Sequence, residues 1–146
     1  MRKILIILLI SMLGIIFISC DEDNPINPIS SELNGTWKAN LIFGPDTIHF
    51  TCNINEANSV ITGYGDLYAY HVQYNGNSKV SESLNRKGDI KGSYIGTEVK
   101  INFSIGDSNY FIGNLMSDKK TMVGTMYIYF ISTDYHGEYL IDLKKQ

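Results

Sequence analysis

From Leu33 onward, apolar and polar residues alternate in short runs that are rich in Tyr, Ile, Val, Phe and Thr. Phe50 and Cys52, for example, are separated by Thr51, and Ile101 and Phe103 by Asn102. Successive side chains of a β-strand point to opposite faces, so each run predicts a strand with one buried face and one wet face. Clusters of Gly, Asn, Asp and Ser separate the runs, and no helical period is present. The chain is therefore predicted to be all-β.

The alternation and the turn clusters together predict eight strands, joined mostly by short hairpins. The expected strands span 35–43, 47–55, 60–73, 88–95, 98–105, 108–116, 121–131 and 137–144. Sequential hairpins favour an antiparallel up-and-down order, and closing eight such strands into a β-barrel removes the exposed sheet edges. Residues 75–88 form the one long polar connection in this interpretation, either a lid over the barrel mouth or a flexible loop.

Four expected strands carry a glycine on their apolar face, at Gly63, Gly92, Gly113 and Gly124. Glycine inside a strand costs stability, so it needs a structural reason. Sharp coiling of strands around a crowded interior supplies one, and ordinary bulges at strand ends supply another. The repetition favours barrel coiling.

The N-terminal segment changes abruptly from apolar to acidic at Cys20. Met1-Arg2-Lys3 is basic, residues 4–18 are almost wholly apolar, and three acidic residues follow the cysteine. Fifteen helical residues would span about 22 Å, which is short of the roughly 30 Å hydrocarbon core of a bilayer. The segment therefore fits a cleaved signal peptide better than a permanent membrane span.

Ile18-Ser19-Cys20 resembles the cleavage site of bacterial lipoproteins, although Phe17 stands where that family usually has Leu. The resemblance implies cleavage after residue 19, acylation of Cys20 and anchoring of the protein to the bacterial outer membrane. The alternative is a signal anchor with an incidental cysteine. Asp21-Glu22-Asp23-Asn24 is similar to the acidic segment of lipoproteins exported to the cell surface in Bacteroidetes-type bacteria, or is simply a solvated linker. Pro25 and Pro28 favour an extended tether.

These boundaries give a signal peptide at 1–19, a lipidated tether at 20–32 and a barrel domain at 33–146. The chain has 12 Lys and Arg against 15 Asp and Glu. Without Arg2 and Lys3 of the signal peptide, 10 basic residues remain and the net charge is −5. An acidic chain with scattered basic residues repels phosphate backbones, so no nucleic-acid partner is expected.

Asn34-Gly35-Thr36-Trp37 opens the first expected strand as Gly-x-Trp. With eight strands, this motif resembles the lipocalin-like, or calycin, barrels. The resemblance implies that Trp37 plugs the closed end of the barrel and that a basic residue of the last strand, Lys144, lies across it. The alternative role for Trp37 is a plain core anchor.

An eight-stranded barrel is either filled by its own side chains or holds one small ligand. The alternation places eleven residues inside: Phe43, Phe50, Cys52, Leu67, Phe103, Phe111, Leu115, Met122, Met126, Ile128 and Phe130. The leading hypothesis is a membrane-anchored, non-enzymatic protein that binds a small apolar molecule in this interior. The ligand would contact Trp37, Phe50, Leu67, Phe103, Phe111, Met122 and Met126. A packed core explains the same residues.

Ten tyrosines are many for so small a domain. Tyr64 and Tyr68 lie on the polar face of one expected strand, and Tyr127 and Tyr129 on that of another. Outward tyrosines offer broad amphipathic contact area, so the second hypothesis is a surface module that recognises a protein or a glycan, as an inhibitor does. The alternative is β-propensity at solvent-facing positions.

No catalytic site, metal or cofactor is expected. His49, His71 and His136 lack metal-ligand spacing. Gly106-Asp107-Ser108 resembles the nucleophile block of Gly-Asp-Ser hydrolases, but those enzymes need an α/β fold around it. Cys52 stands between Phe50 and Ile54, which predicts a buried, inert thiol.

Overall fold

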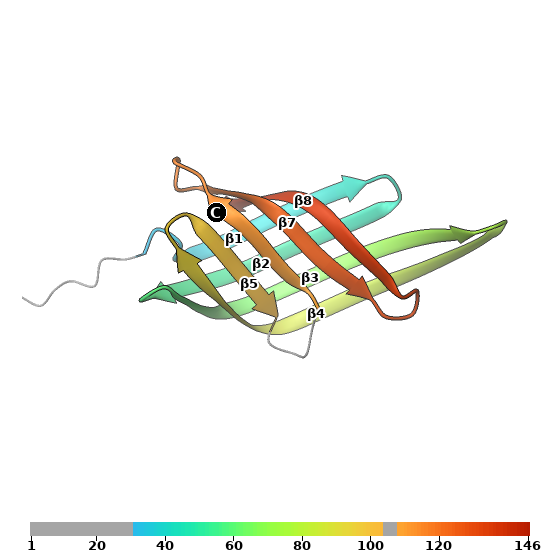
Figure 1. The fold of residues 1–146 in the computed structure, drawn as a ribbon, viewed down its shortest axis with the longest axis horizontal. Helices are drawn as coiled ribbons and strands as arrows, with labels where there is room; N and C mark the ends of the chain where they lie inside the picture. Colours follow the sequence, from blue (N-terminus) through green and yellow to red (C-terminus); the bar gives the residue numbers. More distant parts are fainter. Residues whose placement is uncertain (1–30, 104–107) are drawn as a thin grey trace, which may run out of the picture. The chain divides into compact units, whose positions relative to one another are not determined.

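The computed structural model describes residues 31–103 and 108–146, which form one compact unit of eight β-strands (Figure 1). The strands are β1 (Gly35–Phe43), β2 (Asp46–Ala57), β3 (Val60–Asn75), β4 (Ser78–Ile95), β5 (Glu98–Phe103), β6 (Tyr110–Leu115), β7 (Thr121–Phe130) and β8 (Tyr135–Lys145). The signal peptide, Cys20 and most of the tether lie outside the described residues. Within those residues the structure holds no helix able to cross a membrane.

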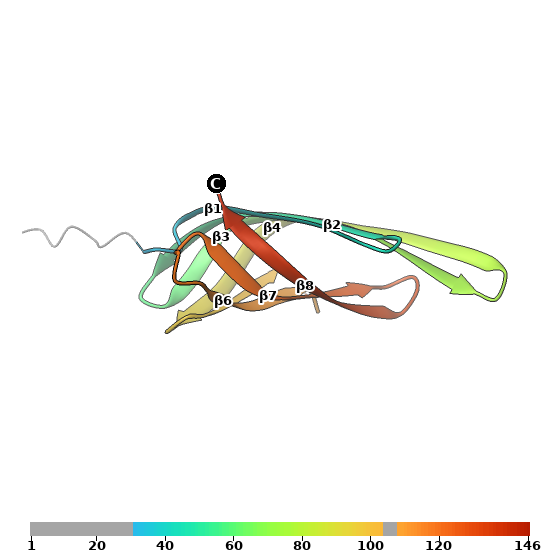
Figure 2. The same cartoon turned by 90° about the horizontal axis from the view of Figure 1, so that it is seen from above.

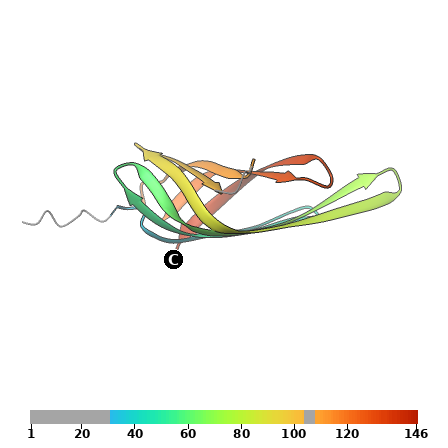
Figure 3. The same cartoon turned by 90° about the horizontal axis from the view of Figure 1, so that it is seen from below.

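Each strand pairs antiparallel with the next, and β8 pairs with β1, so the sheet closes. The predicted all-β fold and the eight-stranded up-and-down barrel are therefore confirmed. Figures 1 and 3 show that β5–β8 cross over one face of β1–β4. The inward side chains of both groups merge into one hydrophobic core between them.

Residues 75–88 are not a long loop, and that prediction was wrong. Asn75 pairs with Ser78 across a two-residue turn, and β4 then pairs in register with β3 as far as Ser93. Figure 2 shows this hairpin extending beyond the other strands. Most of its outer residues are exposed, so little apolar alternation marks them as strand. On β4, the Glu82 carboxylate accepts the backbone N–H groups of Ser132 and Thr133, each at 3.0 Å, which holds the β7–β8 turn against the hairpin.

Ten of the eleven predicted interior side chains are buried, and Phe43 is the exception at 69% exposure. Phe43 pairs with Asp46 at the last register position before the turn at Gly44 and Pro45. Within the described residues, β1 pairs with β8 at Trp37 and Lys38 alone, so Phe43 lies on a part of β1 that has no neighbouring strand on that side to cover it. Alternation gives the face of a strand but not where the neighbouring layer ends.

The glycines of the repeated motif permit close backbone approach, as barrel coiling requires. Gly113 and Gly124 face each other across β6 and β7. A Cβ on Gly113 would lie 2.5 Å from the carbonyl oxygen of Val123, and one on Gly124 would collide with Ile112 and Gly113 backbone atoms. Any larger residue would force the two strands apart.

Gly124→Ala is therefore expected to lower the free energy of unfolding by about 1–3 kcal/mol, the usual cost of inserting a methyl group into a packed site. The colliding atoms are backbone atoms, so no side-chain rotation relieves them. Urea denaturation measures the loss. Thr125→Ala in the same strand is the matched control and should cost less, and equal losses in the two variants would contradict the argument.

Candidate functional site

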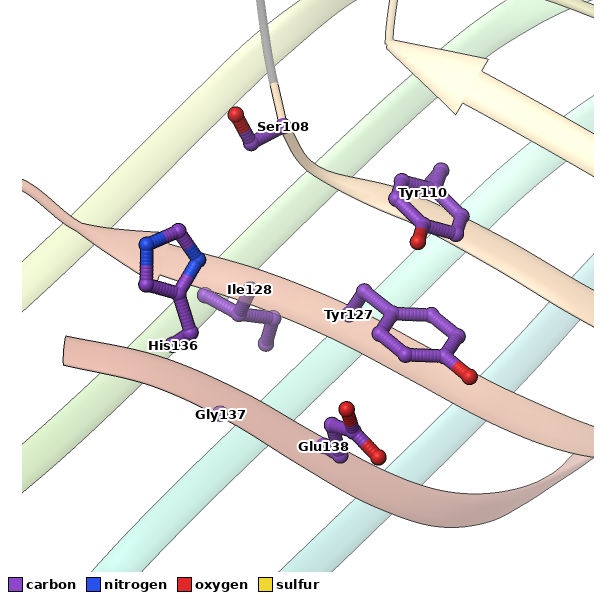
Figure 4. A pocket seen from close by; sticks show the side chains of 7 residues that line it. All are labelled: Ser108, Tyr110, Tyr127, Ile128, His136, Gly137 and Glu138. Atoms are coloured by element: carbon purple, nitrogen blue, oxygen red, sulfur yellow. The ribbon is translucent and has the colours of Figure 1, made fainter.

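A groove of about 480 Å³ lies on the outer face of β6, β7 and β8 (Figure 4). Its lining comprises Ser108, Tyr110, Tyr127, Ile128, His136, Gly137 and Glu138. Ile128 and Gly137 form its floor, because both are buried and alternate along their strands with the outward residues that surround the groove. The other five residues rise around that floor and carry two phenol rings, an imidazole, a hydroxyl and a carboxylate.

Cross-strand register brings the groove residues together. Tyr110 pairs with Tyr127, and Tyr127 pairs with Glu138, so three strands contribute one continuous row. The two tyrosine rings stack with their centroids 4.5 Å apart, which is a favourable aromatic distance. Lys100 of β5 extends the row, since its Nζ lies 5.6 Å from the Tyr110 centroid. Figure 4 shows the rings side by side, with the Glu138 carboxylate next to Tyr127.

A second aromatic pair lies beside this row. The ring of Tyr129 stacks on His136, with centroids 4.4 Å apart, and its hydroxyl donates a hydrogen bond of 2.9 Å to Asp134. That hydrogen bond raises the pKa of Tyr129. The side-chain oxygen of buried Asn109 accepts a hydrogen bond of 2.8 Å from the backbone N–H of Tyr129. This bond links the residue before β6 to β7 at the edge of the groove.

The structure places the four tyrosines of the surface hypothesis in two separate patches. Tyr127 and Tyr129 lie at or beside the groove, while Tyr64 and Tyr68 are exposed on β3, several strands away in the barrel order. Tyr68 stacks on His49 of β2 with centroids 6.0 Å apart. Sequence analysis missed Tyr110, His136 and Glu138 as partners of Tyr127, because only cross-strand register unites them.

The seven residues proposed as ligand contacts all belong to one packed core. Each of them is at most 6% exposed, and the rings of Phe50 and Phe103 meet edge to face with centroids 5.5 Å apart. Even at Gly65, which has no side chain, the space is taken by its neighbours. A Cβ added there would lie 2.8 Å from the Ile90 side chain and 2.9 Å from the Phe103 ring. The interior is therefore filled by side chains at these positions, as close-packed protein cores are.

Trp37 lies near the start of β1, where that strand pairs with the end of β8. Its indole N–H donates to the Leu33 carbonyl at 2.8 Å, and the ring is fully buried. The basic residue over the ring is Lys145, with its Nζ 5.6 Å from the ring centroid. The expectation for Lys144 was wrong, because Trp37 pairs in register with Lys145 and Lys144 instead bonds Thr121.

A buried polar cluster lies toward the opposite end of β1, where the chain enters β2. The Asp46 carboxylate accepts hydrogen bonds from His71 Nδ1 at 3.0 Å, from the Val72 backbone N–H at 3.2 Å and from the Tyr139 hydroxyl at 2.8 Å. The His71 ring stacks on Tyr135 with centroids 3.9 Å apart. Its Nε2 is buried and has no hydrogen-bond partner among the described residues. Sequence analysis missed this cluster, although His71 continues the inward phase of Leu67 in β3.

The described residues hold no group of three side chains suited to a metal ion. Gly106 and Asp107 lie outside the described residues, so the Gly-Asp-Ser comparison has no structural counterpart here. Cys52 is buried as predicted, and burial raises the pKa of its thiol to about 12. A thiol that keeps its proton is a poor nucleophile.

Tyr139→Phe is expected to lower the free energy of unfolding at neutral pH by about 1–2 kcal/mol, because Asp46 loses one buried hydrogen bond. Burial, followed by the bond to Asp46, raises the pKa of Tyr139 above its ordinary 10.0. The folded state therefore retains a proton that the unfolded chain loses above pH 10, and this stabilisation is present below pH 10 and declines above it.

Urea denaturation across pH 7–11 tests this, with exposed Tyr74→Phe as the matched control. The difference in stability between the parent and Tyr139→Phe should narrow above pH 10. A difference that stays constant would show that the hydroxyl proton is not held by the fold.

The chain matches no protein-family model and no curated protein.

Proposed function

We propose that this chain is a non-enzymatic envelope lipoprotein, anchored in the bacterial outer membrane through Cys20, whose barrel recognises a protein or a glycan at the outer groove. The groove carries this proposal. It gathers two stacked tyrosines, a histidine and a carboxylate at one concave site. Rigid aromatic rings with adjacent polar groups are the side chains on which recognition surfaces rely.

The filled interior supports the choice of the outer face. A small apolar molecule inside the barrel would have to displace side chains that already contact one another, at the cost of their packing. The groove requires no such rearrangement. An exposed recognition face also agrees with the acidic segment after Cys20, which resembles an export signal to the cell surface.

A small ligand in the barrel remains the second candidate, and the buried cluster at Asp46 favours it. His71 Nε2 is a buried polar atom without a partner in the described part of the chain, and a ligand hydroxyl would satisfy it. Native mass spectrometry of residues 21–146, purified gently from its host, tests this candidate. A reproducible extra mass that is lost on denaturation would support it, and a clean protein mass would count against tight binding.

Cys20→Ala is expected to abolish incorporation of a clickable fatty acid in cells, because the thiol is the proposed acylation site. Cys52→Ala is the matched control and should keep the label, since Cys52 is buried in the barrel. In-gel fluorescence measures both variants. Label retained on Cys20→Ala would contradict the anchor.

Tyr127→Leu is expected to weaken partner binding roughly tenfold or more, because truncating a central aromatic contact removes much of an interface's binding free energy. Residues 31–146 form a compact unit with its own core, so the soluble chain 21–146 can be screened on glycan and peptide arrays. Tyr64→Leu, an exposed tyrosine of β3, is the matched control. Binding that is absent, or that both variants retain, would overturn the groove as the recognition site.

A further inference from the structure

Glu138 is an exposed carboxylate inside the groove, and no described residue provides it with a counter-charge. Among the residues that the structure describes, it forms no ion pair and accepts no hydrogen bond. It lies next to the Tyr127 ring on the neighbouring strand (Figure 4). The groove therefore presents a negative charge beside an aromatic ring, which is the combination that attracts a cation.

The same row already holds a cation at its other end. Lys100 lies over Tyr110, and Tyr110 stacks on Tyr127. The order across the strands is therefore cation, ring, ring and carboxylate. A positive group between Tyr127 and Glu138 would form a cation–π contact with Tyr127, as Lys100 does with Tyr110. It would also neutralise the charge of Glu138.

From this arrangement we propose that the groove binds the guanidinium group of an arginine in a peptide segment of a partner protein. A guanidinium is planar, stacks on aromatic faces and pairs with a carboxylate through two parallel N–H donors. Lysine offers only a compact point charge for the same site. This inference rests on the proposed function, because it names the chemistry of the partner at the same groove.

The size of the groove agrees with a peptide rather than with a free side chain alone. Its volume of about 480 Å³ exceeds what one guanidinium fills, so flanking residues of the segment have room beside Ser108 and His136. A sugar would stack on the same rings, but it would bring no positive charge to Glu138. The unpaired carboxylate therefore favours the arginine segment over a glycan.

Titration of ¹⁵N-labelled residues 21–146 with N-acetyl-arginine amide, followed by NMR, tests the proposal. The matched neutral probe is N-acetyl-citrulline amide, which keeps the shape of the side chain and removes the charge. We expect shifts at the amides of Tyr110, Tyr127 and Glu138, and roughly fivefold weaker binding of citrulline, the upper range for an exposed ion pair. Glu138→Gln should reduce arginine binding to the citrulline level, while Glu98→Gln on β5, outside the groove, should leave it unchanged.

Equal binding of the two probes, an unchanged affinity in Glu138→Gln or no groove shifts at millimolar arginine amide would each overturn the arginine assignment. Methyl glycosides serve as a third set of probes. If they shift the groove amides and arginine amide does not, the groove is a glycan site, and the proposed function survives while this inference fails. Loss of array binding in Tyr127→Leu reports on the proposed function independently of either probe.

Discussion

The pairing of β1 with β8 is the interaction on which the rest of the structure depends. Trp37 and Lys145 meet at that seam, and the backbone N–H of Gln146 donates to the Thr36 carbonyl at 2.9 Å. Without the seam, β1 and β8 would each expose a row of unpaired backbone groups, and the inner face would open to water. Trp37 belongs both to the seam and to the core, so closure of the sheet and burial of the interior are achieved together.

Closure also decides where recognition chemistry can lie. A closed barrel of this size has one face directed inward, and here that face is occupied by packed side chains. Apart from buried polar residues such as Asp46 and His71, the polar side chains of the strands point outward, where cross-strand neighbours stand close enough to act as pairs. The row from Lys100 through Tyr110 and Tyr127 to Glu138 is such a set of neighbours. The groove is therefore a product of strand register, which the seam and the tight glycine pair help to fix.

Period-two alternation was sufficient to predict the fold class, the strand number and ten of the eleven interior positions. The prediction failed where a strand extends beyond the neighbouring strands that would bury one of its faces. Residues 78–88 lie in a largely exposed hairpin arm, so their polar sequence indicated a loop, and Phe43 lies beyond the part of β1 that pairs with β8. The one-residue error at Lys144 has a related cause, because the sequence of one strand does not determine its register with the strand that it pairs with. The contacts of Glu138 and Tyr110 with Tyr127 were not predicted for the same reason.

The cluster around Asp46 shows how a filled barrel tolerates a buried charge. Three donors from two strands, β3 and β8, converge on that carboxylate, and a buried carboxylate with several hydrogen bonds is far less costly than an isolated one. His71 ties β3 and Tyr139 ties β8 to the start of β2, so the cluster joins strands that are not all neighbours in the sheet. At the other end Trp37 performs a comparable role through packing. The two ends of the barrel are thus held by different forces, apolar contact at one and a charge-centred network at the other. Among the described residues, the second leaves one buried polar atom, His71 Nε2, without a hydrogen-bond partner.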